Sequence, residues 1–224
     1  MLRIIPLLFL AVALNLSAEG GLVLSSKGKL LYAENFGELS KRLQAGKGDW
    51  RIVDGRSIRG MQLKEDRHTA FRKMFLDHQD VIYQFDFKFE GKAHAKFMIN
   101  YELVHLANCI IKPNEFSISK LNEAGKRKQM EAVDKAAGRP GRKGPWQKKN
   151  RVLAKKPMSL PIGKWHTVTI ELVSDQMVAR IGEVVLRGKD SGLKEKKTNF
   201  GIQAAGLNEW VHFDNLKIWQ AEAK

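Results

Sequence analysis

The sequence predicts an all-β sandwich, and three observations support this prediction. Apolar and polar side chains alternate with a period of two over residues 163–173 and again over residues 81–89. This period, carried by β-branched and aromatic residues, is typical of half-buried antiparallel strands. Tight-turn residues such as Asp54-Gly55 separate the alternating segments, and Asp-Gly favours a type I′ hairpin. Helical periodicity is confined to residues 121–137, so strands dominate the expected fold.

The alternating segments predict ten or more short strands, as in β-sandwich domains. They lie at residues 30–32, 50–61 (a hairpin), 71–76, 81–89, 93–101, 104–111, 116–119, 163–185 (three strands), 199–206 and 211–219. We expect the strand at residues 81–89 to be central, because it turns Tyr83, Phe85, Phe87 and Phe89 inward. Burying such a side chain stabilises a fold by about 1.5–3 kcal/mol.

The first eighteen residues are predicted to be a secretory signal peptide. Arg3 precedes an apolar run from Ile4 to Leu16, and the small residues Ser17-Ala18 follow it. The run is shorter than the roughly 20 residues that a membrane-spanning helix needs. We therefore expect cleavage near Ala18, a secreted or periplasmic location in a bacterium, and no membrane span in the remaining chain. Residues 19–224 are expected to form a single domain.

A basic insertion is predicted to interrupt this domain at about residues 121–158. The chain has a net charge of +15, and residues 120–156 hold thirteen Lys and Arg against three acidic residues. Dense Gly and Pro at residues 138–145 exclude regular structure there, so the insertion should be partly helical or disordered. Its candidate basic patch comprises Lys126, Arg127, Lys128, Arg142, Lys143, Lys148 and Lys149.

The basic insertion has two interpretations. It is either a solvated excursion from the sandwich or a binding segment for an anionic polysaccharide. Nucleic acid is disfavoured as a partner, because a stacking surface needs several aromatic residues and Trp146 is the only one interleaved there. Export from the cell also weighs against nucleic acid.

The sequence indicates neither a disulfide nor a cofactor. Cys109 is the single cysteine and lies in an apolar run, so we expect it to be buried and unreactive. Asp214-Asn215 is a candidate for holding a structural Ca²⁺, and the alternative is that Asp214 caps a turn. The strand histidines His94, His105, His166 and His212 do not have the spacing of a zinc site.

A set of short motifs lies along the chain in a characteristic order. They are Phe36-Gly37, Trp50, Val53-Asp54-Gly55, Phe85-Asp86-Phe87, Gly163-Lys164-Trp165-His166-Thr167-Val168-Thr169-Ile170-Glu171, Thr198-Asn199-Phe200-Gly201-Ile202 and Phe213-Asp214-Asn215-Leu216-Lys217-Ile218-Trp219. In this order they resemble the 3-keto-disaccharide hydrolase family. The resemblance implies a concanavalin A-like jelly roll of the lectin/glucanase superfamily, related in fold to family-16 glycoside hydrolases. It also implies cleavage of a glycosidic bond next to a 3-keto group in a disaccharide or glycoside.

Carboxylates on the predicted strands are the first candidates for glycosidase chemistry, which ordinarily uses two of them about 5–9.5 Å apart. The strand at residues 81–89 offers Asp86 alone, and the chain lacks the Glu-x-Asp-x-x-Glu run of the family-16 active strand. Glu102, Glu115 and Glu171 are not paired by their spacing, so we expect solvated carboxylates at these positions. No catalytic residue is assigned, and the alternative to an enzyme is a non-catalytic carbohydrate-binding or cell-envelope module on the same fold.

Polar residues on the predicted strands are the candidates for contact with a sugar. They are Gln84, Asp86, Asn100, Glu102, His105 and Asn108. The group around His105 is of most interest, because sugar sites combine a few convergent polar groups with an aromatic side chain. The sequence does not fix which of these residues meet, because that depends on the register between strands.

Overall fold

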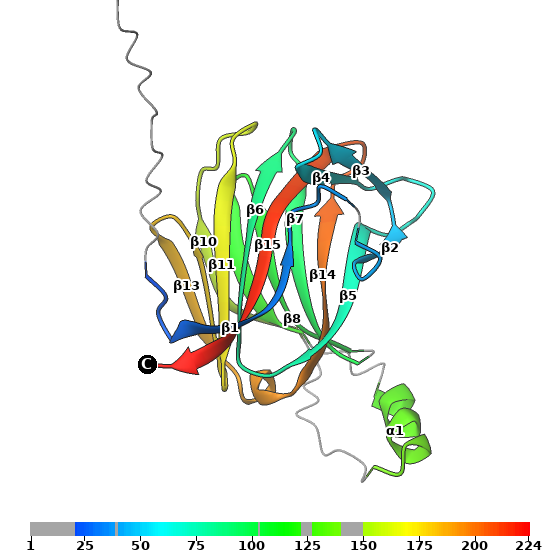
Figure 1. Ribbon diagram of the computed structural model, residues 1–224, viewed down its shortest axis with the longest axis vertical. Coiled ribbons are helices and arrows are strands. Elements are labelled where there is room, and N and C mark those ends of the chain that lie inside the picture. The colour runs from blue at the N-terminus through cyan, green and yellow to red at the C-terminus, as the bar shows by residue number, and fades with distance from the viewer. Residues whose placement is uncertain (1–20, 39, 103, 122–126, 140–149) are drawn as a thin grey trace, which may run out of the picture.

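The computed structural model describes residues 21–38, 40–102, 104–121, 127–139 and 150–224 (Figure 1). Within these residues the strands form two antiparallel sheets that pack face to face, together with one short α-helix. This arrangement confirms the predicted all-β sandwich. No helix in the described ranges is both long enough and apolar enough to cross a membrane.

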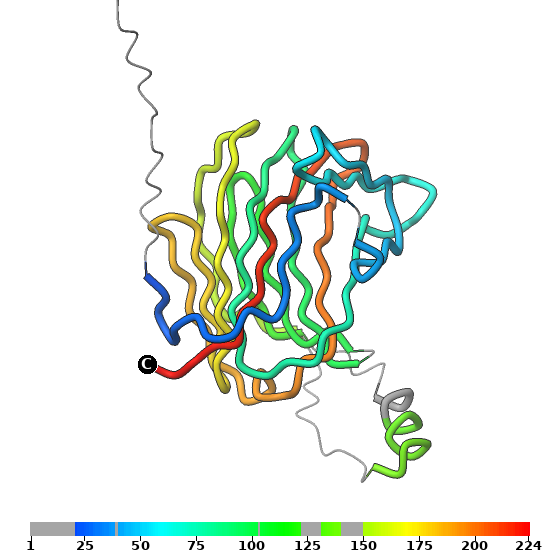
Figure 2. The backbone as a smooth tube through the Cα atoms, viewed as in Figure 1, coloured from blue at the N-terminus to red at the C-terminus, as the bar shows by residue number. Residues whose placement is uncertain are grey.

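The first sheet, which we call sheet A, contains the strand that the sequence predicted to be central. Its order is β13 (Val184–Lys189), β12 (Gln176–Ile181), β11 (His166–Val173), β6 (Val81–Phe89), β15 (Trp210–Ala223), β4 (Ser57–Met61) and β3 (Asp49–Val53). The C-terminal half of β15 pairs with β1 (Ser25–Glu34), so the first and last strands run side by side (Figure 2).

The second sheet, sheet B, is built mainly from the strands between β6 and β11. Its order is β10 (Arg151–Pro157), β9 (Glu115–Lys120), β8 (Val104–Lys112), β7 (His94–Tyr101), β14 (Lys197–Ala205), β5 (Ala70–His78) and β2 (Gln44–Lys47). The strands β7 to β10 form a continuous antiparallel meander, because each pairs with the next along the chain.

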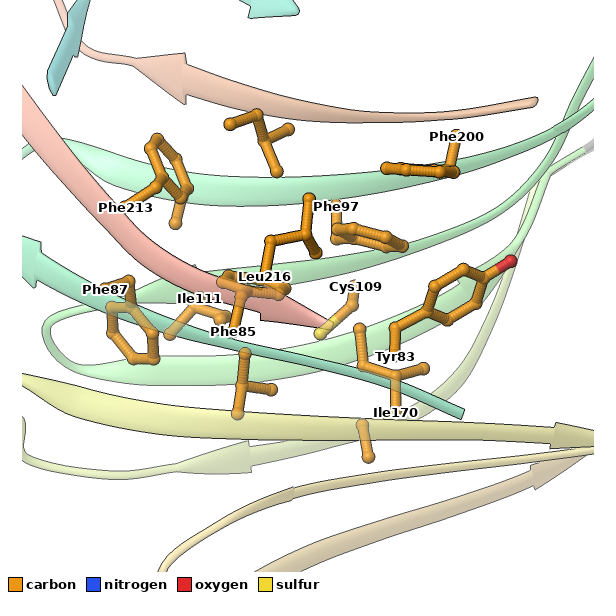
Figure 3. Packing of buried hydrophobic residues seen from close by; sticks show 14 of the residues in the cluster. Tyr83, Phe85, Phe87, Phe97, Cys109, Ile111, Ile170, Phe200, Phe213 and Leu216 are labelled. Atoms are coloured by element: carbon orange, nitrogen blue, oxygen red, sulfur yellow. The ribbon is translucent and has the colours of Figure 1, made fainter. Parts of the chain in front are cut away.

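The core lies between the sheets and is rich in aromatic side chains (Figure 3). As predicted, β6 is central, and Tyr83, Phe85 and Phe87 are buried in the core. The rings of Phe85 in sheet A and Phe97 in sheet B stack with centroids 5.3 Å apart. Cys109 is buried beside them, and burial raises the pKa of its thiol. The thiol is therefore kept protonated and unreactive.

The tight turns lie where the sequence placed them. Asp54 and Gly55 both have positive φ, 53° and 59°, and join β3 to β4 as a type I′ hairpin requires. Ser174 and Gly182, with φ of 53° and 52°, close the β11–β12 and β12–β13 turns. The three strands predicted over residues 163–185 are thereby confirmed.

Two strands were not expected from the sequence. β2 (Gln44–Lys47) is fully exposed, and β10 (Arg151–Pro157) is basic and largely exposed. Neither has the apolar alternation that marks a half-buried strand. β10 pairs with β9, so regular sheet structure extends into residues that composition assigned to the insertion. The helix α1 (Arg127–Ala136) lies beyond the end of the sandwich that is opposite the β3–β4 hairpin (Figure 1).

Glu171 differs from its expected role as a solvated carboxylate. It does lie on the outward face of β11, but it is only 3% exposed. Its carboxylate accepts hydrogen bonds from the backbone N–H groups of Val23, Leu24 and Ser25, at 2.7–3.1 Å. The prediction of solvation was wrong because a segment almost 150 residues away in sequence crosses the sheet at this point.

Candidate functional site

The outer face of sheet B carries the largest group of buried polar side chains that point away from the core. Phe97, Ile99, Phe200 and Ile202 point inward, so their neighbours in β7 and β14 point outward. Register aligns these outward residues in rows across the sheet. One row is Phe75–Asn199–Asn100–His105, and the next is Lys73–Gly201–Met98–Asn108–Ser119.

The first row contains a network of side-chain amides. Asn100 Nδ2 donates a hydrogen bond of 2.6 Å to Asn199 Oδ1, and His105 Nδ1 donates one of 2.7 Å to Asn100 Oδ1. Asn199 Nδ2 in turn donates to the Glu102 carbonyl oxygen at 3.0 Å. Asn100 and Asn199 are buried. The network therefore holds the β7–β8 turn against the start of β14.

Glu102 lies in that turn with a φ of 48°. Its backbone N–H donates to Thr198 Oγ1 at 2.5 Å. Its carboxylate Oε1 accepts hydrogen bonds from Arg139 at 2.7 Å and from the Tyr101 hydroxyl at 3.2 Å. Arg139 also lies 3.1 Å from the carboxylate of Asp134. Glu102 thus joins the end of sheet B to the segment that carries α1.

Two adjoining hollows open beside this turn, with volumes of about 590 and 510 Å³. Both are lined by Asp77, Glu102, Arg139 and Thr198. The larger is also lined by Phe75, whose side chain is 60% exposed at the edge of the first row. An open apolar ring next to hydroxyl, carboxylate and guanidinium groups is a typical lining for a small polar ligand. We call these two spaces together the Glu102 hollow.

The Glu102 hollow is lined by three carboxylate residues, Asp77, Glu102 and Glu195, and the first two lie in different environments. The Glu102 side chain is 19% exposed and ion-paired with Arg139, whereas the Asp77 side chain is 63% exposed and pairs with Lys196. Paired carboxylates are the groups that glycosidic-bond hydrolysis uses. The structure therefore supplies a second carboxylate that spacing along the sequence did not reveal.

The predicted sugar-facing residues separate into two groups. Asn100, Glu102 and His105 lie together through the amide network, and of the three only Glu102 lines the Glu102 hollow. Asn108 lies one row away on the same face, where it is 4% exposed and its Oδ1 has no hydrogen-bond partner among the described residues. A buried amide oxygen without a partner is rare in folded proteins.

Gln84 and Asp86 lie on the outer face of the opposite sheet. Asp86 accepts hydrogen bonds from Thr167 at 2.6 Å and from Asn215 at 2.7 Å. Asp214 is its cross-strand neighbour. Burial, and then the charge of Asp86, raise the pKa of Asp214, while a backbone hydrogen bond from Asn215 opposes that rise. Gln84 and Asp86 therefore lie on the opposite outer face of the sandwich from His105, so they cannot contact one small ligand together with it.

The Ca²⁺ candidate Asp214-Asn215 also belongs to this face of sheet A. Asp214 Oδ1 accepts from the Asn215 N–H at 2.6 Å, as expected for a carboxylate that caps a turn. The described residues contain no cluster of three or more His, Cys, Asp or Glu side chains that could hold a metal ion.

Most of the basic patch lies outside the described residues. Lys126, Arg142, Lys143, Lys148 and Lys149 fall in the ranges that the structure leaves out, and Arg127 and Lys128 begin α1. The binding of anionic polysaccharide by this patch stays a prediction.

Sequence reasoning missed most of the lining of the hollow, including Phe75, Asp77 and Thr198, and it missed Asn199 in the neighbouring amide network. Thr198-Asn199 was noticed as a motif, but it was interpreted as part of a strand. Asn199 becomes a site residue because register sets it directly opposite Asn100, 99 residues earlier in the chain. Phe75 carried the one local signal, since it is a large apolar residue on an outward-facing position of β5.

Comparison with known proteins indicates the fold. No family model matches the sequence. No curated protein matches it either. Among solved structures, a carbohydrate-binding module of an evolved Dit protein from Lactobacillus casei BL23 phage J-1 superposes with a TM-score of 0.64 at 8% identity, covering 88% of this chain and 98% of that one. A carbohydrate-binding module from Bacillus subtilis superposes with a TM-score of 0.57 at 11% identity, covering 80% of this chain and 95% of that one. A family-16 endo-β-1,3(4)-glucanase superposes with a TM-score of 0.58 at 11% identity, covering 89% of this chain and 93% of that one.

These similarities cover nearly the whole length of the compared chains, so the likeness extends over the complete sandwich. At such low identity they establish the architecture and leave the chemistry of the site to its residues. The chain has the jelly-roll sandwich fold that the concanavalin A-like resemblance implied.

Proposed function

We propose that the protein binds a neutral saccharide in the Glu102 hollow. The observation that carries this proposal is the exposed Phe75 ring beside the fixed polar groups of Glu102, Thr198 and Asp77. An aromatic face packs against the apolar C–H face of a sugar ring, while nearby oxygens and nitrogens bind its hydroxyl groups. The names of the structural neighbours, two carbohydrate-binding modules and a glucanase, support the same class of ligand.

The buried amide network fits a positioning role in such a site. Asn100, His105 and Asn199 fix the turn that carries Glu102 before any ligand arrives. A site that is fixed in advance loses less entropy when it binds. The first eighteen residues have the sequence pattern of a secretory signal peptide. We therefore propose that the protein acts in the periplasm or outside a bacterial cell.

The test is a titration of the protein with neutral disaccharides such as trehalose, cellobiose and laminaribiose. Phe75→Ala should lower the affinity for the disaccharide that binds most tightly about tenfold, because it removes the stacking surface. Phe71→Ala is the matched control, since Phe71 lies on the same strand and face but lines neither part of the hollow. Equal effects of the two substitutions, or no binding to the unaltered protein, would overturn the proposal.

A second candidate function is hydrolysis of a 3-keto-glycoside at the same hollow. The specific observation that favours it is the presence of two carboxylates, Asp77 and Glu102, in the lining of both spaces of the hollow. The Glu102 side chain is 19% exposed and ion-paired with Arg139, whereas the Asp77 side chain is 63% exposed and ion-paired with Lys196. Two carboxylates in such different surroundings suit the separate roles of an acid and a base in one reaction.

Incubation with 3-keto-trehalose separates the two candidates. A hydrolase should release free sugar, and Glu102→Gln and Asp77→Asn should each lower the rate by about 100-fold or more while binding is retained. Asp66→Asn, remote from the hollow, should leave the rate unchanged. Binding without turnover in the unaltered protein would leave the non-catalytic module as the function.

A further inference from the structure

A larger hollow lies on the outer face of sheet A, on the other side of the sandwich from the Glu102 hollow. Its volume is about 860 Å³. Strands β1, β6, β11 and β12 contribute its walls, together with the segment that leads into β11. The lining residues that matter for binding are Lys27, Gln84, Trp165, Thr167, Thr169 and Arg180.

The charged side chains in the described lining of this hollow, those of Lys27, Arg180 and Lys224, are of one sign. Lys27 and Arg180 reach its lining, and none of the described lining residues has a carboxylate side chain. Lys27 Nζ donates to Gln84 Oε1 at 3.1 Å and lies 4.2 Å from the centre of the Trp219 ring. Arg180 has no carboxylate partner within the part of the chain that the structure describes. An uncompensated guanidinium in a concave surface attracts anions.

Hydrogen-bonding groups extend from Arg180 across the sheet. Register sets Arg180 opposite Thr169 and Thr169 opposite Gln84. Neighbouring strands are about 4.8 Å apart, so this row spans roughly 10 Å, a length that suits one or two sugar rings. Hydroxyl and amide groups along the row match the hydroxyl groups of a saccharide, and the guanidinium matches an anionic group at one end.

Trp165 forms an aromatic wall of this hollow and separates it from a smaller hollow. Its side chain is 43% exposed and lines this hollow as well as a smaller one, of about 420 Å³, on its other side. The smaller hollow contains the carboxylates of Asp54 and Asp214 together with the cations of Arg56 and Lys88. Its charges are therefore mixed, whereas the charged side chains on the Arg180 side are basic, so an anion is attracted more strongly on the Arg180 side.

We propose that this hollow is a second saccharide site, selective for a sugar that carries a carboxylate or sulfate group. Arg180 binds the anionic group with its planar fork of donors. Thr169 and Gln84 bind ring hydroxyls, and Trp165 packs against the ring. The site shares no lining residue with the Glu102 hollow, so the two proposals stand or fall separately.

The experiment follows the indole N–H signal of Trp165 by NMR, assigned with Trp165→Phe, during titration with a methyl glucuronide, a methyl glucoside and glucose 6-sulfate. At about 150 mM salt, where long-range attraction to a basic protein is screened, the anionic sugars should bind about tenfold more tightly than the glucoside. The ratio between glucuronide and sulfate then identifies the preferred anionic group.

Arg180→Gln should lower the affinity for the anionic sugars about tenfold and leave the affinity for the glucoside unchanged. Arg187→Gln is the matched control, because Arg187 is exposed on the neighbouring strand β13 outside the hollow. If Arg180→Gln reduces folding, Lys27→Gln tests the same charge requirement from β1. Phe75→Ala should have no effect on these titrations.

Three results would overturn the proposal. One is equal affinity for glucuronide and glucoside, and another is equal loss with Arg180→Gln and Arg187→Gln. The third is inorganic sulfate that binds as tightly as the anionic sugars and produces the same shift of the Trp165 signal, because the hollow would then recognise an anion without a sugar.

Discussion

On the outer face of sheet B the central polar side chains bind one another, whereas on the outer face of sheet A they bind charges, rings and the N-terminal segment. Asn100 and Asn199 form a buried amide pair. Glu171, at a comparable outward position, receives backbone N–H groups from residues 23–25 instead. The comparison teaches that alternation along a strand marks an outer face, but the segments that meet there decide its role.

The largest expected effect tests the role of the buried carboxylate in sheet A. Glu171→Ala removes the acceptor for three backbone N–H groups and for the Ser25 hydroxyl. Because hydrogen bonds to a charged group are strong and the freed donors are partly buried, we expect the free energy of unfolding to fall by about 3 kcal/mol. Urea denaturation measures this change.

The control for Glu171→Ala is Glu183→Ala, in the exposed β12–β13 turn. It should change the free energy of unfolding by less than about 0.5 kcal/mol. Similar values for the two variants would contradict the structural role assigned to Glu171, and the contrast between the two faces would then lose its main support.

The next effect compares two asparagines on the outer face of sheet B. Asn199→Ala breaks bonds to Asn100, to Thr198 and to the Glu102 carbonyl oxygen, and should cost about 2 kcal/mol of stability. Asn108→Ala, also buried, breaks no bond to Oδ1 and should cost less than about 1 kcal/mol. Thermal unfolding of both variants tests the difference. Equal losses would mean that the amide network does not hold the turn.

The fold was predictable because its signals are local. Alternation identified β6 with its exact bounds and β11 with its exact C-terminal end, although β11 begins at His166 and not at residue 163, and Asp54-Gly55 identified its hairpin. β2 and β10 were missed because an exposed edge strand needs no apolar face. They form through backbone pairing with β5 and β9, which leaves no pattern in their own side chains.

The candidate site was predictable only in part, because it depends on register. Asn100, Glu102 and His105 are near one another in sequence, so a local reading found them. Asn199 enters the site from β14 and Phe75 from β5, through pairings that alternation does not determine. The same limit put Gln84 and Asp86 in the predicted site, although β6 belongs to the other sheet.

The third effect concerns a polar contact in the interior, between the two faces. His78 at the end of β5 is hydrogen-bonded to Tyr83 of β6, and burial lowers the pKa of His78 to about 4. An unfolded histidine has a pKa near 6.5. As pH falls from about 6.5 to 4, His78 becomes protonated in the unfolded chain but stays largely neutral in the folded chain. The free energy of unfolding therefore falls, by on the order of 2 kcal/mol.

His78→Gln should flatten this pH dependence, and His68→Gln, at an exposed position, should preserve it. Urea midpoints at pH 7, 5.5 and 4.5 give the comparison. An unchanged slope in His78→Gln would show that other groups cause the loss of stability in acid. The interior contact would then be no more sensitive to pH than the two outer faces.

The smallest expected effect on stability separates the insertion from the sandwich. Lys120 and Arg151 are paired in register at the ends of β9 and β10, so a short Asn-Gly turn can replace residues 122–149. The ion pair between Arg139 and Glu102 is partly exposed, and such pairs contribute at most about 1 kcal/mol. The shortened chain should therefore unfold with nearly the same free energy as the full chain.

The same excision affects the two proposed sites differently. It removes Val133 and Arg139 from the lining of the Glu102 hollow, so binding of neutral sugar should weaken about threefold to tenfold. The described lining of the hollow beside Arg180 includes none of the excised residues 122–149, so binding of the glucuronide there should persist. Loss of acidic polysaccharide binding on excision would assign that activity to the basic patch. Parallel loss of neutral sugar and glucuronide binding would contradict the division of function between the two faces.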